Sequence, residues 1–142
     1  MPSAHNHLPQ RVAITGASGL IGTSLVGHLK SEGHTVQRLV RRKTVAPDEV
    51  FWDPAKGEID LAPLEGVDAI IHLAGANVGD KRWTKRYRAE ILNSRLLGTT
   101  AIANAANTLK PDVVISASAI GWYGETGNRA VNENDRAGDD FL

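Results

Sequence analysis

A doubly wound α/β fold, in which helices cover both faces of a mostly parallel β-sheet, is predicted from three observations. Short runs rich in β-branched residues alternate along the chain with segments of helical periodicity. The first run ends in a glycine-rich turn that leads straight into a helical segment. The chain has 142 residues, 42% of them apolar, which is enough for one packed domain.

Five short apolar segments are expected to form the strands. Residues 11–15 are largely β-branched and end at a glycine, which is typical of a buried strand. Residues 67–75 are apolar almost throughout, as expected when both faces of a parallel sheet are covered. In chain order, the expected strands are 11–15, 34–40, 49–52, 67–75 and 112–118.

Two helices are expected between these strands. In residues 20–31 apolar side chains recur at helical spacing, and Gly33 follows where glycine commonly ends a helix. A longer helix is expected from about residue 84 to residue 109, with Pro111 beyond its end. The apolar face of the first comprises Leu20, Ile21, Leu25, Val26 and Leu29, and that of the second comprises Trp83, Tyr87, Ile91, Ser94, Gly98, Ala101, Ile102 and Ala105.

The alternation of strands and helices implies right-handed crossovers, and hence a Rossmann-type doubly wound parallel sheet with strand order 3-2-1-4-5. In this arrangement the fifth strand lies at an open edge, whereas a complete sheet of this type has a sixth strand beside it. We therefore expect the fold to be truncated before its last strands.

Composition and charge exclude several classes of function. Basic and acidic residues number 16 each, so no net charge draws the chain to nucleic acid or to an anionic membrane. Cysteine is absent, which excludes disulfides, thiolate metal sites and cysteine nucleophiles. No apolar run approaches the ~20 residues of a membrane span, and the polar start lacks the apolar core of a signal peptide. We expect a cytoplasmic protein with no membrane partner, and the sequence carries no signal for its oligomeric state.

Two other groups of residues invite a functional interpretation. His5 and His7 lie in a polar leader, where a pair of histidines is usually not a metal site, and no metal is predicted. A basic group at the start of the long helix is interrupted by aromatic residues, which is typical of a solvated helix end, so no nucleic-acid partner is predicted. The basic residues of this group are Lys81, Arg82, Lys85, Arg86 and Arg88.

The glycine-rich turn, TGASGLIG at residues 15–22, follows a strand and opens a helix, which is the context of a dinucleotide-binding loop. Gly16 permits the tight turn, Gly19 lets a pyrophosphate approach the backbone, and Gly22 lets the helix pack close to the sheet. The free N–H groups of the helix N-terminus attract phosphates. An ordinary strand-to-helix turn is the alternative, but the five alternating elements favour a cofactor site at Thr15, Gly16, Ser18, Gly19, Leu20, Ile21 and Gly22.

The end of the second expected strand, VRRK at residues 40–43, bears on the choice of dinucleotide. A carboxylate at this point would bind the ribose 2′-hydroxyl of NAD, but none is present. Arg41 and Arg42 are suited to a 2′-phosphate, so NADP(H) is favoured over NAD(H), with a solvated basic loop as the alternative. Asp53 is expected either to reach the adenine or to start a turn. The small residues Leu73, Ala74 and Gly75 are expected to lie against the cofactor at a strand end.

Four stretches of the chain carry a resemblance to a known family. They are TGASGLIG at 15–22, IHLAGA at 71–76, SRLLGT at 94–99 and SASAIGWYG at 116–124. Together they resemble the extended and atypical short-chain dehydrogenase/reductases, and within that group the NAD(P)-dependent nucleoside-diphosphate-sugar epimerase-like family. The polar leader at residues 1–10 is expected to be a disordered tail. The resemblance covers residues 11–142 and implies an incomplete NAD(P)-binding Rossmann domain that lacks the substrate-binding part.

The resemblance also implies a chemistry. Members of the family bind NADP(H) or NAD(H) and act on a hydroxyl or carbonyl group of a small molecule, a nucleotide sugar being one candidate, by hydride transfer. A Tyr serves as acid/base, a Lys lowers its pKa, and a Ser orients the substrate oxygen. Ser118 matches the family serine just past the fifth strand, and Tyr123 matches a tyrosine on the substrate side.

The chain departs from the family pattern at two points. No Tyr-x-x-x-Lys pair is present, because Ile91 stands four residues after Tyr87 and Gly127 four residues after Tyr123. The resemblance places that pair beyond the last residue. Arg95 stands where many extended members have an Asn, which is either a packing or surface arginine or a change to the water relay of the site.

Two functions of different class follow from these observations. The first is an NADP(H)-binding oxidoreductase or sugar-nucleotide epimerase-like enzyme. The alternative is a non-catalytic dinucleotide-binding sensor or interaction protein that kept the glycine loop and lost the chemistry. An intact Tyr and Lys on one helix would favour the enzyme.

Overall fold

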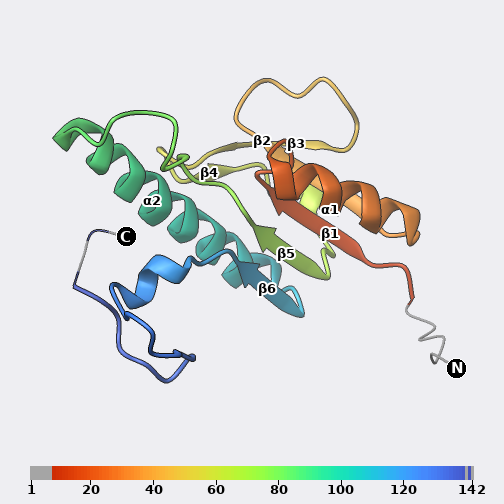
Figure 1. Ribbon diagram of the computed structural model, residues 1–142. Coiled ribbons are helices and arrows are strands. Elements are labelled where there is room, and N and C mark those ends of the chain that lie inside the picture. Colours follow the sequence, from red (N-terminus) through yellow and green to blue (C-terminus); the bar gives the residue numbers. More distant parts are fainter. Residues whose placement is uncertain (1–7, 140, 142) are drawn as a thin grey trace, which may run out of the picture.

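A six-stranded sheet forms the centre of the part of the chain that the computed structural model describes, residues 8–139 and 141 (Figure 1). The strands are β1 (Arg11–Thr15), β2 (Thr35–Val40), β3 (Glu49–Asp53), β4 (Glu58–Ile59), β5 (Ala69–His72) and β6 (Val113–Ser116). The helices are α1 (Leu20–Ser31) and α2 (Lys85–Leu109), with short 3-10 helices η1 (Ala62–Leu64) and η2 (Ile120–Tyr123). Residues 1–7, in which most of the expected disordered tail falls, lie outside the described residues.

The strand order is β4-β3-β2-β1-β5-β6, and all neighbours except β3 and β4 pair in parallel. The expected order 3-2-1-4-5 is thereby confirmed as β3-β2-β1-β5-β6. Strand β4 was not expected. It pairs antiparallel with the end of β3, and the chain turns back between them at Gly57, whose φ is +70°. This short hairpin covers the outer edge of β3.

Two hydrophobic clusters lie on opposite faces of the sheet, because successive residues of a strand point to opposite sides. Ala13 of β1 belongs to a cluster that includes Ile102 of α2. Val12 and Ile14 of β1 belong to the other cluster, which packs against α1 through Leu25, Val26 and Leu29. Each helix therefore covers one face, as the doubly wound prediction requires (Figure 1).

The buried face of α2 matches the prediction for six positions. They are Tyr87, Ile91, Gly98, Ala101, Ile102 and Ala105. Trp83 was placed on this face wrongly, because it precedes the N-cap Thr84 and is 36% exposed.

Two further expectations about burial were wrong. Leu20 and Ile21 are 92% and 69% exposed. The face of α1 that packs on the sheet begins at the buried Gly22 and continues with the partly buried Leu25, Val26 and Leu29, which leaves Leu20 and Ile21 outside it. The residues of β6 from Val113 to Ile115 were expected to be buried but are exposed, since β6 pairs only with β5 among the described strands.

Candidate functional site

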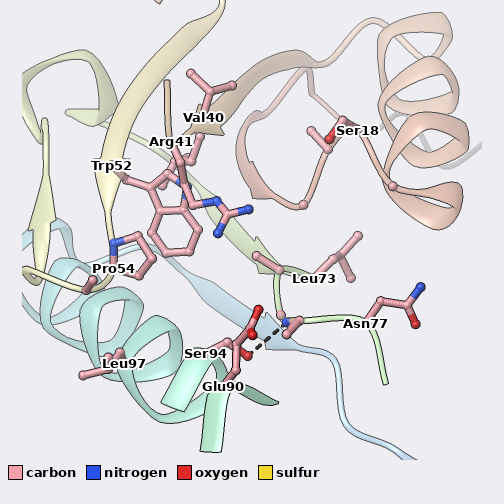
Figure 2. Close-up of a pocket in the computed structure, with 18 of the residues that line it drawn as sticks. Ser18, Val40, Arg41, Trp52, Pro54, Leu73, Asn77, Glu90, Ser94 and Leu97 are labelled. Carbon is pink, nitrogen blue, oxygen red and sulfur yellow. Dashed lines mark hydrogen bonds between the residues drawn. The ribbon is translucent and has the colours of Figure 1, made fainter. Parts of the chain in front are cut away.

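A cleft of about 1120 Å³ opens at the carboxyl ends of the parallel strands (Figure 2). Its walls come from the glycine loop, the end of β2, the turn after β3, the segment after β5 and one side of α2. In an open α/β sheet this edge is where ligands bind. The residues predicted from the sequence that line the cleft are Gly16, Ser18, Gly19, Arg41, Arg42, Leu73, Ala74 and Gly75.

The glycine loop is held by contacts that tolerate no side chain at two of its glycines. Gly16 has φ +70°, and a Cβ there would lie 2.9 Å from the backbone N of Ala74. A Cβ on Gly22 would lie 2.1 Å from the carbonyl oxygen of Gly16. Gly19 is the N-cap of α1 and lacks a side chain to cap the helix, so the N–H groups of the first turn are left for a ligand.

Four of the predicted loop residues do not line the cleft. Thr15 is fully buried behind it, and Gly22 packs against the loop backbone. The side chains of Leu20 and Ile21 point to solvent. These two residues stand in the first turn of α1, so their contribution to a phosphate site is limited to backbone N–H groups.

A buried polar pair fixes the strand ends beneath the cleft. The Thr15 hydroxyl oxygen accepts hydrogen bonds from the backbone N–H groups of Leu73 and Ala74, at 3.1 and 3.2 Å. Its hydrogen is therefore left to donate to His72 Nδ1, 2.7 Å away. Burial, and to a lesser extent the charge of Arg95, lower the pKa of His72, which favours the neutral imidazole. This pair ends β5 at His72, three residues earlier than expected.

The two arginines at the end of β2 have different partners. The Arg42 guanidinium donates two hydrogen bonds to the Glu49 carboxylate, at 2.9 and 2.6 Å. Glu49 also accepts from the backbone N–H of Val45 at 2.8 Å. Hydrogen bonds from Arg42 and Val45, together with the charge of Arg38, lower the pKa of Glu49 to about 2. Arg42 is thus committed to a carboxylate.

Arg41 makes no hydrogen bond or ion pair with any residue in the described part of the chain. Figure 2 shows its guanidinium extending into the cleft beside the ring of Trp52. Of the two arginines predicted to hold a 2′-phosphate, Arg41 is the one whose donors remain available to a ligand.

The turn after β3 contributes apolar rather than acidic groups to the cleft. Asp53 does not line it; its carboxylate accepts from the backbone N–H of Ala55 at 3.1 Å and pairs with Lys56 at 3.3 Å. This is the turn-starting alternative. Trp52, only 2% exposed, and Pro54 line the cleft instead. Neither was expected there, although an aromatic residue at the carboxyl end of a strand was a usable signal.

Helix α2 supplies a wall that was not predicted. Glu90, Asn93, Ser94 and Leu97 face the cleft, and Ser94 had been expected on the apolar face. The Ser94 hydroxyl accepts a hydrogen bond from the backbone N–H of Ala76 at 2.9 Å (Figure 2). The helix therefore fixes the segment that follows β5. These residues recur three and four apart and so lie on one side of the helix, but the spacing alone could not show that this side faces a cleft.

Ser118 and Tyr123 do not line the cleft. Ser116 of β6 pairs with His72 of β5, and the backbone N–H of Ala117 continues the ladder to the His72 carbonyl at 2.9 Å. Ser118 therefore follows β6 at the same sheet edge at which Leu73 to Gly75 follow β5. Tyr123 lies further along, in η2, and is partly buried.

Two of the five basic residues near the start of α2 are engaged by neighbours. The Lys81 ammonium lies 3.7 Å from the Glu90 carboxylate and over the ring of Tyr87. The Arg88 guanidinium lies over the ring of Trp83. No cluster of three potential metal ligands occurs among the described residues. None of the helices in this part of the chain has the length and apolarity needed to cross a bilayer.

Comparison with known proteins gives consistent matches. A profile of the NAD dependent epimerase/dehydratase family matches residues 12–140. An epimerase family protein from Mycobacterium leprae is 40% identical over 131 residues, which cover 92% of this chain and 43% of that protein. The chain therefore spans less than half the length of this curated relative.

Two solved structures illustrate the likeness of the fold. The human epimerase family protein SDR39U1, crystallised with NADPH, has a TM-score of 0.77 and 30% identity, over 92% of this chain and 44% of that one. MoeE5 in complex with UDP-glucuronic acid and NAD has a TM-score of 0.73 and 27% identity, over 89% of this chain and 42% of that one. MoeE5 was also solved with UDP-glucose and NAD.

Proposed function

Because the chain belongs to the NAD-dependent epimerase/dehydratase family, we propose that it binds NADP(H) in the cleft and takes part in hydride transfer to or from a nucleotide sugar. When bound, the nicotinamide would supply the hydride acceptor or donor. The whole protein would then be an oxidoreductase or a sugar epimerase. Residues 11–142 would form its dinucleotide-binding part, and the substrate-binding part would correspond to the remaining length of the relatives.

The observation that carries this proposal is the glycine loop seen together with the cleft. A dinucleotide needs a phosphate cradle, and the uncapped N-terminus of α1 at Gly19 offers N–H donors and a partial positive charge. The contacts at Gly16 and Gly22 keep that cradle open and bring it to the strand edge. An adenosine would then extend toward Arg41, between the apolar surfaces of Trp52, Pro54 and Leu97.

NADP(H) is proposed over NAD(H) because of the charges at the end of β2. Asp48 and Glu49, which precede and begin the neighbouring strand β3, pair with Arg38 and Arg42, so neither is left to bind a ribose 2′-hydroxyl. Arg41 retains its donors and faces the cleft, and a guanidinium binds a phosphate with charge-assisted hydrogen bonds. The human relative was solved with NADPH and MoeE5 with NAD, so both cofactors occur among similar proteins.

Other residues of this chain would have separate roles in positioning the cofactor and the substrate. The Thr15–His72 pair would hold the backbone of residues 73–74 against the cofactor. Ser118, at the neighbouring strand end, would orient the reacting oxygen of the substrate, and Tyr123 would line the substrate side. A positioned donor next to the reacting oxygen acts by general acid–base and electrostatic stabilisation.

Titration with NADPH and NADH tests the cofactor assignment. We expect Arg41→Ala to weaken NADPH binding about tenfold or more, the loss of one charge-assisted hydrogen bond, and to leave NADH binding unchanged. Lys43→Ala removes the same charge two residues away, outside the cleft, and is expected to change neither affinity beyond twofold. Quenching of Trp52 fluorescence is a suitable signal because the ring lines the cleft.

Three results would each count against part of the proposal. Tighter binding of NADH than of NADPH by the unaltered protein would remove the cofactor preference. Equal losses for both dinucleotides in Arg41→Ala would show that the arginine does not recognise a 2′-phosphate. Binding of NADPH without turnover of any nucleotide sugar or carbonyl compound would instead favour a dinucleotide sensor.

A further inference from the structure

Arg95 reaches the sheet edge through the space that a side chain on Gly75 would fill. A Cβ built on Gly75 would lie 2.5 Å from the Arg95 Cζ and 2.6 Å from its Nη1. The guanidinium thus lies directly against the Gly75 backbone, and this contact requires a glycine at position 75. Gly75 lines the dinucleotide cleft, so the arginine stands immediately behind that wall.

The charge of Arg95 has no counter-charge in the described part of the chain. Its guanidinium makes no ion pair and no hydrogen bond with any residue described there, and the side chain is exposed. Its charge is nevertheless felt at the strand edge, where it contributes to the lowered pKa of His72. A guanidinium held against the backbone with its donors unused is suited to receiving an anion.

The position of Arg95 points to the side of the sheet edge that carries Ser118. Successive residues of an α-helix are about 100° apart, so Ser94 faces the dinucleotide cleft while Arg95 lies further round the helix. Gly75 and Ser118 follow β5 and β6, which are adjacent. Figure 1 shows the chain after β6 running back alongside α2. The ring centroids of Phe141 and of Trp83, which precedes α2, are 5.5 Å apart. The guanidinium therefore lies against the segment that follows β5, and Ser118 lies in the segment that follows the adjacent strand β6.

We propose that Arg95 binds a negatively charged oxygen of the substrate, either a sugar carboxylate or the diphosphate of a nucleotide sugar, and holds it beside the dinucleotide. This inference rests on the proposed function and assigns a substrate-binding role to a residue that lies outside the dinucleotide cleft. A purely structural arginine would need only to fill the space beside Gly75, and an uncharged side chain of similar length would then replace it.

The experiment uses the full-length protein saturated with NADP⁺ and two probes that differ by one carboxylate, UDP-glucuronic acid and UDP-glucose. We expect Arg95→Met, which keeps the length of the side chain, to weaken binding of UDP-glucuronic acid about tenfold or more. Arg95→Lys keeps the charge without the planar fork and is expected to restore part of the loss. Arg86→Met, an exposed change of the same charge on the same helix, is the control.

The two probes separate the two sources of the anion. A loss for UDP-glucuronic acid alone assigns Arg95 to the carboxylate, and equal losses for both probes assign it to the diphosphate, provided that NADPH affinity is unchanged. The inference is overturned if the unaltered protein binds NADPH but neither probe. It is also overturned if Arg95→Met changes the affinity for neither probe, or if it lowers the NADPH affinity by the same factor as the probe affinity. Failure of the unaltered protein to bind NADPH would instead overturn the proposed function.

Discussion

Gly22 and Gly27 both lie in α1, five residues apart, and the structure predicts that alanine has opposite effects at the two positions. A Cβ on Gly22 would lie 2.1 Å from the Gly16 carbonyl oxygen and 2.8 Å from the Ala17 Cα. Both atoms belong to the backbone of the glycine loop and cannot rotate away. A Cβ on Gly27 would meet nothing within 4 Å. The same substitution in the same helix therefore isolates the contact between the helix and the loop.

The magnitudes follow from packing and from helix propensity. Forcing one extra carbon into a well-packed site costs about 1–3 kcal/mol, and the fixed backbone contact places Gly22→Ala at about 3 kcal/mol of lost unfolding free energy. Replacing an exposed mid-helix glycine by alanine gains about 0.5–1 kcal/mol, so Gly27→Ala should stabilise the fold. The two variants should differ by roughly 4 kcal/mol, which in a domain of this size is about 13 °C in Tm.

Thermal and urea unfolding of the two variants measure this difference in stability. An NADPH titration of each variant measures whether the loop still binds the dinucleotide. Gly22→Ala should also lose NADPH affinity, because the loop can relieve the contact only by moving away from the helix N-terminus. Equal stability of the two variants would refute the loop geometry. A stable Gly22→Ala protein with unaltered NADPH affinity would refute the placement of the phosphates.

Two further predictions concern the polar groups around the cleft. The pKa of Glu49 is depressed from 4.5 to about 2, so its contacts stabilise the folded state fully above pH 4.5 and are lost as the pH falls toward 2. Glu49→Gln should flatten the pH dependence of urea unfolding in that window, and an unchanged slope would contradict the Arg42 pairing. Thr15→Val leaves the Ala74 backbone N–H and His72 Nδ1 without their partner, at about 1–3 kcal/mol for each buried unsatisfied group, and should weaken NADPH binding. The Leu73 N–H keeps the Thr15 backbone carbonyl as its acceptor, at 3.3 Å. Thr15→Ser keeps the hydroxyl and should retain both stability and affinity; a Thr15→Val variant as stable as Thr15→Ser would show that the pair does not fix the strand ends.

The features that the sequence predicted correctly are those set by local pattern. Strand order and the glycine loop depend on the alternation of elements and on residues close together in the chain, such as Gly16 and Gly22. Strand β4 is only two residues long and is defined by its pairing with β3, so it has no sequence periodicity from which it could be predicted. The wall that α2 contributes to the cleft likewise depends on the approach of Ser94 to Ala76, 18 residues away.

The adjacent Arg41 and Arg42 show why the sequence could locate the candidate site but could not tell which arginine is available to a ligand. Their identical chemistry made them equivalent as phosphate ligands, and the sequence offered no reason to separate them. Parallel pairing places Arg38 of β2 opposite Glu49 of β3, and the loop between the strands brings that carboxylate to Arg42. Arg42 then stabilises the loop, while Arg41 keeps its donors for a ligand. The distinction arises from strand register, so Glu49→Gln should lower stability by releasing Arg42, whereas the cofactor preference should depend on Arg41.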